Sequence, residues 1–191
     1  MAGGASRRMG TDKAFLELDG QPLVVRITGA LVAAGSEDVF VVGGAGPRLA
    51  ALGLRCVPDR WPGEGPLGAL ITALAAARYE AVVVLAADLA VPDPTAVGAL
   101  VAASRASSPV VVPRSSGRAE VLQAAYRRSL FEDLVRVFQL GERSIVRALA
   151  RLDIVPVEVS VAPSIDLDTP EDLAAYLAGR APEASRRPWV N

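Results

Sequence analysis

Short apolar stretches alternate along the chain with longer segments in which apolar residues recur every three or four positions. The short stretches are rich in valine, and some are apolar throughout, which is typical of parallel strands buried on both faces. We predict six strands, at residues 38–42, 54–57, 81–85, 109–112, 121–126 and 154–159.

The longer segments predict helices. In the first, residues 22–34, the apolar side chains of Leu23, Ile27 and Leu31 fall on one face, and Gly35 follows as a C-cap. Strands that alternate with helices indicate an α/β sandwich with a mostly parallel sheet, whose ligands bind beyond the carboxyl ends of the strands. Further helices are predicted at residues 66–78, 94–104, 127–138, 142–151 and 169–178.

Length and composition favour one domain that needs no disulfide. With 191 residues the chain is long enough to bury a core of its own. We assign residues 1–178 to a single domain and expect a disordered tail at 179–191, which is rich in Arg, Pro and Ser. The single cysteine, Cys56, and the absence of any apolar run of membrane-spanning length predict a cytoplasmic protein without a membrane partner.

Charge and residue types exclude several functions. The 20 basic residues are balanced by 21 acidic ones, so no global field attracts a nucleic acid. Histidine is absent, which excludes Ser-His-Asp and Cys-His catalysis and zinc sites with histidine ligands. The remaining chemistry depends on carboxylates, arginines, backbone amides, a hard metal ion and the only lysine, Lys13.

The amino-terminal segment combines glycines, a hydroxyl group and cations. Glycines let a backbone approach phosphate closely and point amides at it, and cationic side chains can neutralise a triphosphate and its departing pyrophosphate. A Walker loop is excluded, because five residues separate Gly4 from Gly10 and Thr11 follows. The candidate phosphate contacts are Ala2, Gly3, Gly4, Ser6, Arg7, Arg8 and Lys13.

A Pro- and Gly-rich turn spans residues 58–70, between a predicted strand and a predicted helix. Free amides at the start of that helix face the expected site, and small residues allow a base or ribose to pack against the backbone. Pro66 and Leu67 are the candidate nucleotide contacts there. The alternative interpretation is a turn with no ligand role.

Two carboxylates are candidate metal ligands. Asp88 follows the strand at 81–85, and a carboxylate in that position can hold Mg²⁺, which takes oxygen ligands and bridges phosphates. Asp166 and Asp168 share one side of an extended segment, and Asp166 is the candidate second ligand. Alternatively, Asp88 caps a turn, and Asp168 organises the start of the last helix.

Taken in order, these motifs resemble the molybdenum cofactor guanylyltransferase family. The amino-terminal loop is similar to the family's L-A-G-G-x-x-x-R-M-G-x-D-K-A/G motif, and the later segments are similar to its G-P-L-A-G, C-D-x-P, G-E-R and N/D-x-N/D-T-P-E-D/E-L motifs. The matching segments are Ala2 to Gly4, Arg8 to Gly10, Asp12 to Ala14, Gly65 to Ala69, Ala87 to Ala90, Gly141 to Ser144 and Asp166 to Leu173.

The resemblance implies a three-layer α/β/α nucleotidyltransferase that transfers GMP from GTP to molybdopterin. It implies Mg²⁺ on Asp88 with Asp166 close by, phosphate contacts from Lys13 and Arg8, and a position for Asp59 near the nucleoside. It also implies that the product is handed to molybdoenzymes or their chaperones.

The sequence departs from the family pattern in places, and two alternatives stay open. The resemblance implies an apolar strand before Ala2, but here Met1 stands at the family's Leu position, and Val121 replaces a family proline. Within the same class, the chain could transfer CMP to molybdopterin or a nucleotide to another small phosphate. From another class, it could be a non-catalytic nucleotide-binding homologue lacking its first strand.

Overall fold

The computed structural model describes residues 12–104, 108–115, 118–154, 156–160 and 170–179. The predictions for the loop at residues 2–11, for Asp166 and for residues 180–191 of the expected tail therefore lie outside the described residues. Within the described ranges, no helix is long and apolar enough to cross a membrane.

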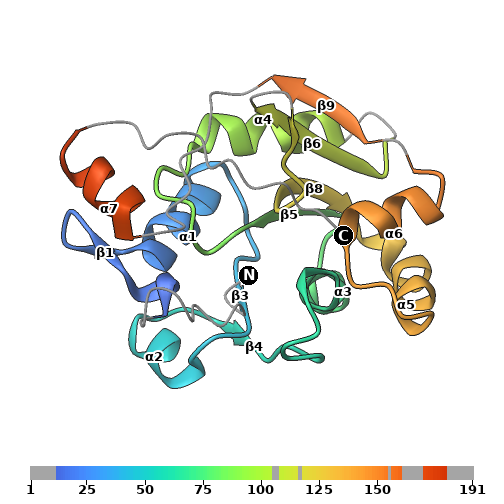
Figure 1. Ribbon diagram of the computed structural model, residues 1–191, viewed down its shortest axis with the longest axis horizontal. Helices are drawn as coiled ribbons and strands as arrows, with labels where there is room; N and C mark the ends of the chain where they lie inside the picture. Colours follow the sequence, from blue (N-terminus) through green and yellow to red (C-terminus); the bar gives the residue numbers. More distant parts are fainter. Residues whose placement is uncertain (1–11, 105–107, 116–117, 155, 161–169, 180–191) are drawn as a thin grey trace.

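The main sheet joins five strands (Figure 1). Strand β8 (Gln123–Arg127) lies between β5 (Ala81–Leu85) and β6 (Val110–Ser115) and is antiparallel to both. Beyond it, β6 pairs in parallel with β9 (Val157–Ser160) and antiparallel with the short β7 (Arg118–Ala119). Strands β5, β6 and β9 thus share one direction, whereas the strand predicted at 121–126 runs against them, and three of the four pairings described in this sheet are antiparallel.

Helices cover both faces of this sheet, which confirms the predicted layered α/β architecture. Side chains alternate between the faces because successive residues of a strand point to opposite sides. Val82 and Val84 pack with α3 (Pro66–Ala76), α5 (Phe131–Gln139) and α6 (Ile145–Arg151).

The opposite face of the sheet packs mainly against one helix. Val111 and Ala125 contact Leu100 of α4 (Pro94–Ser104), and the partly buried Val83 joins them. A short 3₁₀ turn, Arg128–Leu130, precedes α5, so the helix predicted from residue 127 begins as a tighter turn.

A second, smaller sheet stands beside β5. Strand β3 (Val41–Val42) pairs in parallel with β4 (Cys56–Val57), and α2 (Gly46–Ala51), which the sequence did not predict, connects them. Helix α1 (Leu23–Ala33) lies against α4 and leads toward β3 (Figure 1). Gly35 follows this helix with a φ of +87°, as expected of a residue that ends a helix.

A cavity of about 350 Å³ separates the two sheets. Among the described strands, β5 pairs only with β8 and β3 only with β4, so the facing sides of β5 and β3 carry no strand between them. The walls come from α1, β3, α3, β5 and α4, and include Ile27, Leu31, Val41, Ala73, Val83 and Val101.

The two ends of the described chain meet beside α1. A hairpin of β1 (Glu17–Leu18) and β2 (Gln21–Pro22) turns at Asp19 and Gly20, which both have positive φ. Helix α7 (Pro170–Leu177), from the other end of the chain, lies next to it in Figure 1. Contacts of Leu173 and Tyr176 with the apolar cluster around Leu18 hold α7 there.

Candidate functional site

Lys13 and Asp88, the sequence's candidate cation and candidate metal ligand, lie side by side. The Lys13 Nζ is 3.6 Å from Asp88 Oδ2, and the two side chains are 16% and 31% exposed. Asp88 lies in the turn that follows β5, at the carboxyl end of that strand. Both charged side chains are therefore partly exposed at this edge of the sheet.

Local structure and packing position Lys13. It begins a 3₁₀ turn, Lys13–Phe15, whose N-cap Asp12 accepts a hydrogen bond from the Ala14 N–H at 3.2 Å. Ala14 is 1% exposed and belongs to an apolar cluster that includes Ala87, the residue before Asp88. Burial of the Ala14 methyl group thus anchors the lysine turn next to the aspartate turn.

The Lys13–Asp88 ion pair contributes little to the stability of the fold, but its two groups can bind ligands of opposite charge. Partly exposed ion pairs contribute little to folding, because water screens them and two side chains lose freedom. A lysine ammonium has three donors, and a carboxylate oxygen is a preferred ligand of hard cations. Together they can hold a phosphate group and a divalent cation side by side.

Asp59, the predicted nucleoside neighbour, organises the turn after β4. Its Oδ1 accepts hydrogen bonds from the Trp61 N–H at 3.0 Å and from the Thr72 hydroxyl, 3.2 Å away. The Thr72 oxygen also accepts the Arg60 N–H at 3.2 Å. Through these bonds, Asp59 holds the turn against α3, which is a structural role.

The two other predicted contacts in this turn, Pro66 and Leu67, differ in their surroundings. Pro66 is exposed at the first position of α3, after Gly65, whose φ of +89° favours glycine. Leu67 is fully buried in the main core, so its side chain packs inside the protein. Its backbone N–H donates to the Arg143 carbonyl at 3.4 Å.

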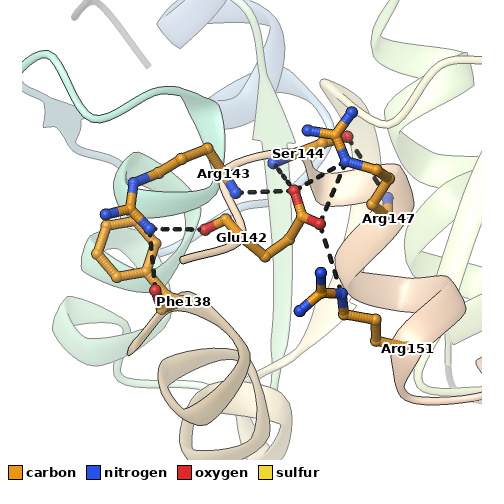
Figure 2. A network of polar contacts seen from close by, with 6 residues as sticks. All are labelled: Phe138, Glu142, Arg143, Ser144, Arg147 and Arg151. Carbon is orange, nitrogen blue, oxygen red and sulfur yellow. Dashed lines mark hydrogen bonds and ion pairs between the residues drawn. The ribbon is translucent and has the colours of Figure 1, made fainter. Parts of the chain in front are cut away.

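A buried carboxylate, Glu142, lies between α5 and α6 (Figure 2). It is 4% exposed and is the only charged residue among the buried residues that the structure describes. Its Oε1 accepts the N–H groups of Arg143 and Ser144 at 2.8 and 2.9 Å, and the Arg147 Nε at 3.0 Å. Arg151 Nε lies 3.6 Å from Oε2.

These partners outweigh the cost of burial for the Glu142 charge. The Ser144 N–H, together with the Arg143 N–H and the Arg147 guanidinium, holds the pKa of Glu142 below its usual value, although desolvation raises it. The sequence identified this residue only through the resemblance of Gly141 to Ser144. In the sequence, the available signal was an acidic residue with arginines five and nine positions later.

Seven predicted site residues cannot be placed, because they lie outside the described ranges. Within those ranges, no group of three or more Asp, Glu or Cys side chains gathers around a possible metal position. Asp88 is therefore the predicted metal ligand whose surroundings the structure gives. The seven residues are Ala2, Gly3, Gly4, Ser6, Arg7, Arg8 and Asp166.

Comparison with known proteins identifies the family. The family model named MobA-like NTP transferase domain matches residues 1–155 of the sequence. The chain belongs to the MobA-like NTP transferase domain family. This assignment confirms the predicted nucleotidyltransferase class and the family resemblance seen in the sequence.

Curated relatives agree with this MobA-like NTP transferase assignment, and a solved structure shares the fold. A probable molybdenum cofactor guanylyltransferase of Chloroflexus aggregans is 36% identical over 93% of this chain and 92% of its own. The molybdenum cofactor guanylyltransferase of Rhodobacter capsulatus is 33% identical over 91% of this chain and 90% of its own. The fold matches molybdopterin-guanine dinucleotide biosynthesis protein A of Archaeoglobus fulgidus, with a TM-score of 0.73, 22% identity, and coverage of 93% and 96% of the two chains.

Proposed function

We propose that this protein transfers GMP from GTP to molybdopterin and releases pyrophosphate, with Mg²⁺ as its cofactor. The observation that carries the proposal is the 3.6 Å approach of the Lys13 ammonium to the Asp88 carboxylate. Curated relatives that align over nine-tenths of the chain are guanylyltransferases of the molybdenum cofactor, which supports the choice of substrates.

The proposed reaction needs no protein nucleophile. An oxygen of the acceptor phosphate attacks the α-phosphorus of GTP, a new P–O bond forms, and the bond to the bridging oxygen of the β-phosphate breaks. Pyrophosphate leaves with that electron pair. Catalysis then depends on positioning and charge neutralisation, which a chain without histidine can supply.

In this proposal each charged residue has one task. Lys13, with Arg7 or Arg8, neutralises the charge that develops on pyrophosphate, and amides of Ala2, Gly3 and Gly4 and the Ser6 hydroxyl hold the phosphates. Asp88 would hold Mg²⁺, with Asp166 as a second ligand.

The chemistry of Asp88 fits this metal ion. Mg²⁺ is usually held by one or two carboxylates together with substrate phosphates and several waters, and the Asp88 side chain is 31% exposed. When bound, the ion neutralises phosphate charge as a Lewis acid. Asp59, Pro66 and Leu67 belong to the turn that we propose lies beside the nucleoside, with Leu67 contributing backbone atoms only.

The central test is the conservative substitution Asp88→Asn. It removes a hard anionic ligand without changing side-chain size, so we expect Mg²⁺-dependent pyrophosphate release from GTP and molybdopterin to fall at least about a hundredfold. The matched control is Asp133→Asn on α5, an exposed carboxylate paired with Arg136. Near-normal turnover of the Asp88 variant, with an unchanged melting temperature, rejects the assignment.

The same assay decides between the candidate functions. Faster turnover of CTP than of GTP would contradict guanylyl transfer and favour the cytidylyl alternative. Nucleotide binding without pyrophosphate release would favour a non-catalytic homologue. We further propose that the reaction takes place in the cytoplasm, in keeping with the free thiol of Cys56, and that molybdoenzymes or their chaperones receive the product.

A further inference from the structure

The segment between α5 and α6 is joined to the turn that opens α3, although the two lie far apart in sequence. Arg143 makes the connection through both its backbone and its side chain. Its carbonyl accepts the Leu67 N–H at 3.4 Å, and its Nε donates to Glu64 Oε2 at 2.6 Å. Arg143 therefore contacts the residues on either side of Gly65 and Pro66.

The side chain of Arg143 is itself held in place (Figure 2). Its Nη1 donates to the carbonyls of Phe138 and Glu142, each at 2.9 Å, and its guanidinium lies 3.9 Å from the centre of the Phe138 ring. A guanidinium with several fixed acceptors loses much of its rotational freedom. It can therefore set the position of Glu64 in the opposing turn.

Glu142 determines the backbone conformation from which Arg143 extends. Its carboxylate binds the N–H groups of Arg143 and Ser144, and Arg147 and Arg151 hold that carboxylate from the other side. Because Glu142 is buried, replacing it would leave these N–H groups without their acceptor in a site that excludes water. The Arg143 carbonyl and side chain would then lose their fixed direction.

The opposing turn is a close neighbour of the α5–α6 segment. A Cβ atom on Gly65 would meet the Arg143 carbonyl oxygen at 3.5 Å, an ordinary van der Waals distance. Trp61, in the same turn, packs on Phe138 with ring centroids 5.1 Å apart. A shift of the α5–α6 segment would therefore be transmitted to the turn at residues 61–67.

We propose that Glu142 is a positioning residue for nucleotide binding, acting through Arg143 on the turn that opens α3. The inference rests on the proposed function, in which this turn lies beside the nucleoside. Glu142 does not itself contact the substrate. It holds the turn in the geometry that binds GTP, so its loss weakens GTP binding more than it slows the chemical step.

The test compares Glu142→Gln with Glu64→Gln and the control Asp133→Asn in the full-length protein. Gln turns one carboxylate oxygen into an NH₂ donor, so the side chain cannot accept from the Arg143 and Ser144 N–H groups without placing that donor against the Arg147 and Arg151 guanidiniums. We expect the KM for GTP to rise about tenfold for Glu142→Gln, with kcat changed less than about twofold. Glu64→Gln removes only the charge from the link with Arg143 at the surface, and we expect a smaller rise in KM with no loss of folding.

A second measurement reports the solvent exposure of the turn through Trp61. In a Trp189→Phe background, Trp61 is the only tryptophan, and we expect acrylamide to quench its fluorescence more strongly in Glu142→Gln than in the parent. A lower melting temperature of the variant, with no change in the KM for GTP, would indicate a purely structural role. An unchanged KM for GTP in both variants overturns the inference, whether or not quenching changes.

The controls separate the two proposals. If the parent protein neither binds GTP nor releases pyrophosphate, the proposed function fails and the inference fails with it. If the parent is active and the Glu142 and Glu64 variants have the parent's KM, only the positioning role is wrong.

Discussion

The two sides of β5 differ in how completely they are packed. Toward β8, a five-residue antiparallel ladder and the side chains of α3, α5 and α6 form a continuous core. Toward β3, a cavity of about 350 Å³ separates β5 from the smaller sheet. One strand therefore borders both a close-packed region and a loosely packed one, and the same substitution should have different effects in each.

Two acidic side chains with little exposed surface show the same difference. Glu142, on the packed side, has hydrogen-bond partners for both carboxylate oxygens. Asp38, at the cavity, is bound by Arg55 through Oδ1, but its buried Oδ2 has no hydrogen bond and only a distant partner, the Arg78 Nε at 4.0 Å. The Oδ2 atom of Asp38 therefore lacks a neighbour at hydrogen-bond distance, just as apolar side chains that line the cavity lack close contacts on that side.

The largest expected effect is on the free energy of unfolding, and it differs between two isoleucines on helices when each is replaced by alanine. Ile71→Ala removes a fully buried side chain from the packed core and should lower the free energy of unfolding by about 4 kcal/mol. Ile27→Ala removes a side chain that lines the existing cavity, where fewer contacts are lost, and should cost about 2 kcal/mol. Denaturant titration measures both, and equal losses would contradict the difference in packing.

Two alanines provide the converse test. Ala73→Leu on α3 adds methylene groups into the cavity and should stabilise the protein by about 1 kcal/mol. Ala148→Leu on α6 adds the same groups to a fully buried position of the packed core and should destabilise it by about 2 kcal/mol through overpacking. If thermal unfolding shows that both substitutions destabilise, the cavity cannot accept added volume.

The sequence predicted the packed side better than the cavity side. The strand at 81–85 has the predicted bounds, because a run of apolar residues suits a strand that is buried on both faces. The strand predicted at 38–42 is reduced to Val41–Val42, because in the described sheet it meets only the two residues of β4. The length of a strand depends on its partner, which local pattern does not reveal.

Turn chemistry explains two further differences. The hairpin around Asp19 and Gly20 was missed, although Asp-Gly is a strong turn signal. The helix predicted from Glu142 begins at Ile145, with Ser144 as its N-cap, because the Glu142 carboxylate binds the preceding N–H groups instead. The residue at which this helix begins therefore depends on its own arginines, which help to hold the Glu142 carboxylate in place.

The candidate site was predictable where it follows from topology. A carboxylate after a buried strand is expected at the ligand edge of an α/β sheet, and Asp88 lies there beside Lys13. The environments of Leu67 and Asp59 were less predictable. Whether a turn residue faces the core, as Leu67 does, or binds its own turn, as Asp59 does, depends on tertiary contacts.

The smallest expected effect is on the pH dependence of stability, and it differs between two tyrosines. Burial raises the pKa of Tyr126 far above its usual value, and its hydroxyl donates to the Val121 carbonyl at 2.5 Å within the packed region. Tyr79 is 51% exposed at the cavity, where its hydrogen bond to Glu37 raises its pKa. Because the folded protein disfavours the Tyr126 phenolate, its contribution is full below about pH 10, the unfolded pKa, and is lost as the pH rises above it.

We therefore expect Tyr126→Phe to cost about 1 kcal/mol at neutral pH, by leaving the Val121 carbonyl without its donor, and to reduce the loss of stability under alkaline conditions. The matched variant Tyr79→Phe should change neutral stability little, because water replaces the lost partner at an exposed site. Denaturant titrations across the alkaline range compare the slopes of stability against pH. If Tyr79→Phe flattens that slope as much as Tyr126→Phe does, desolvation in the packed region is not the cause.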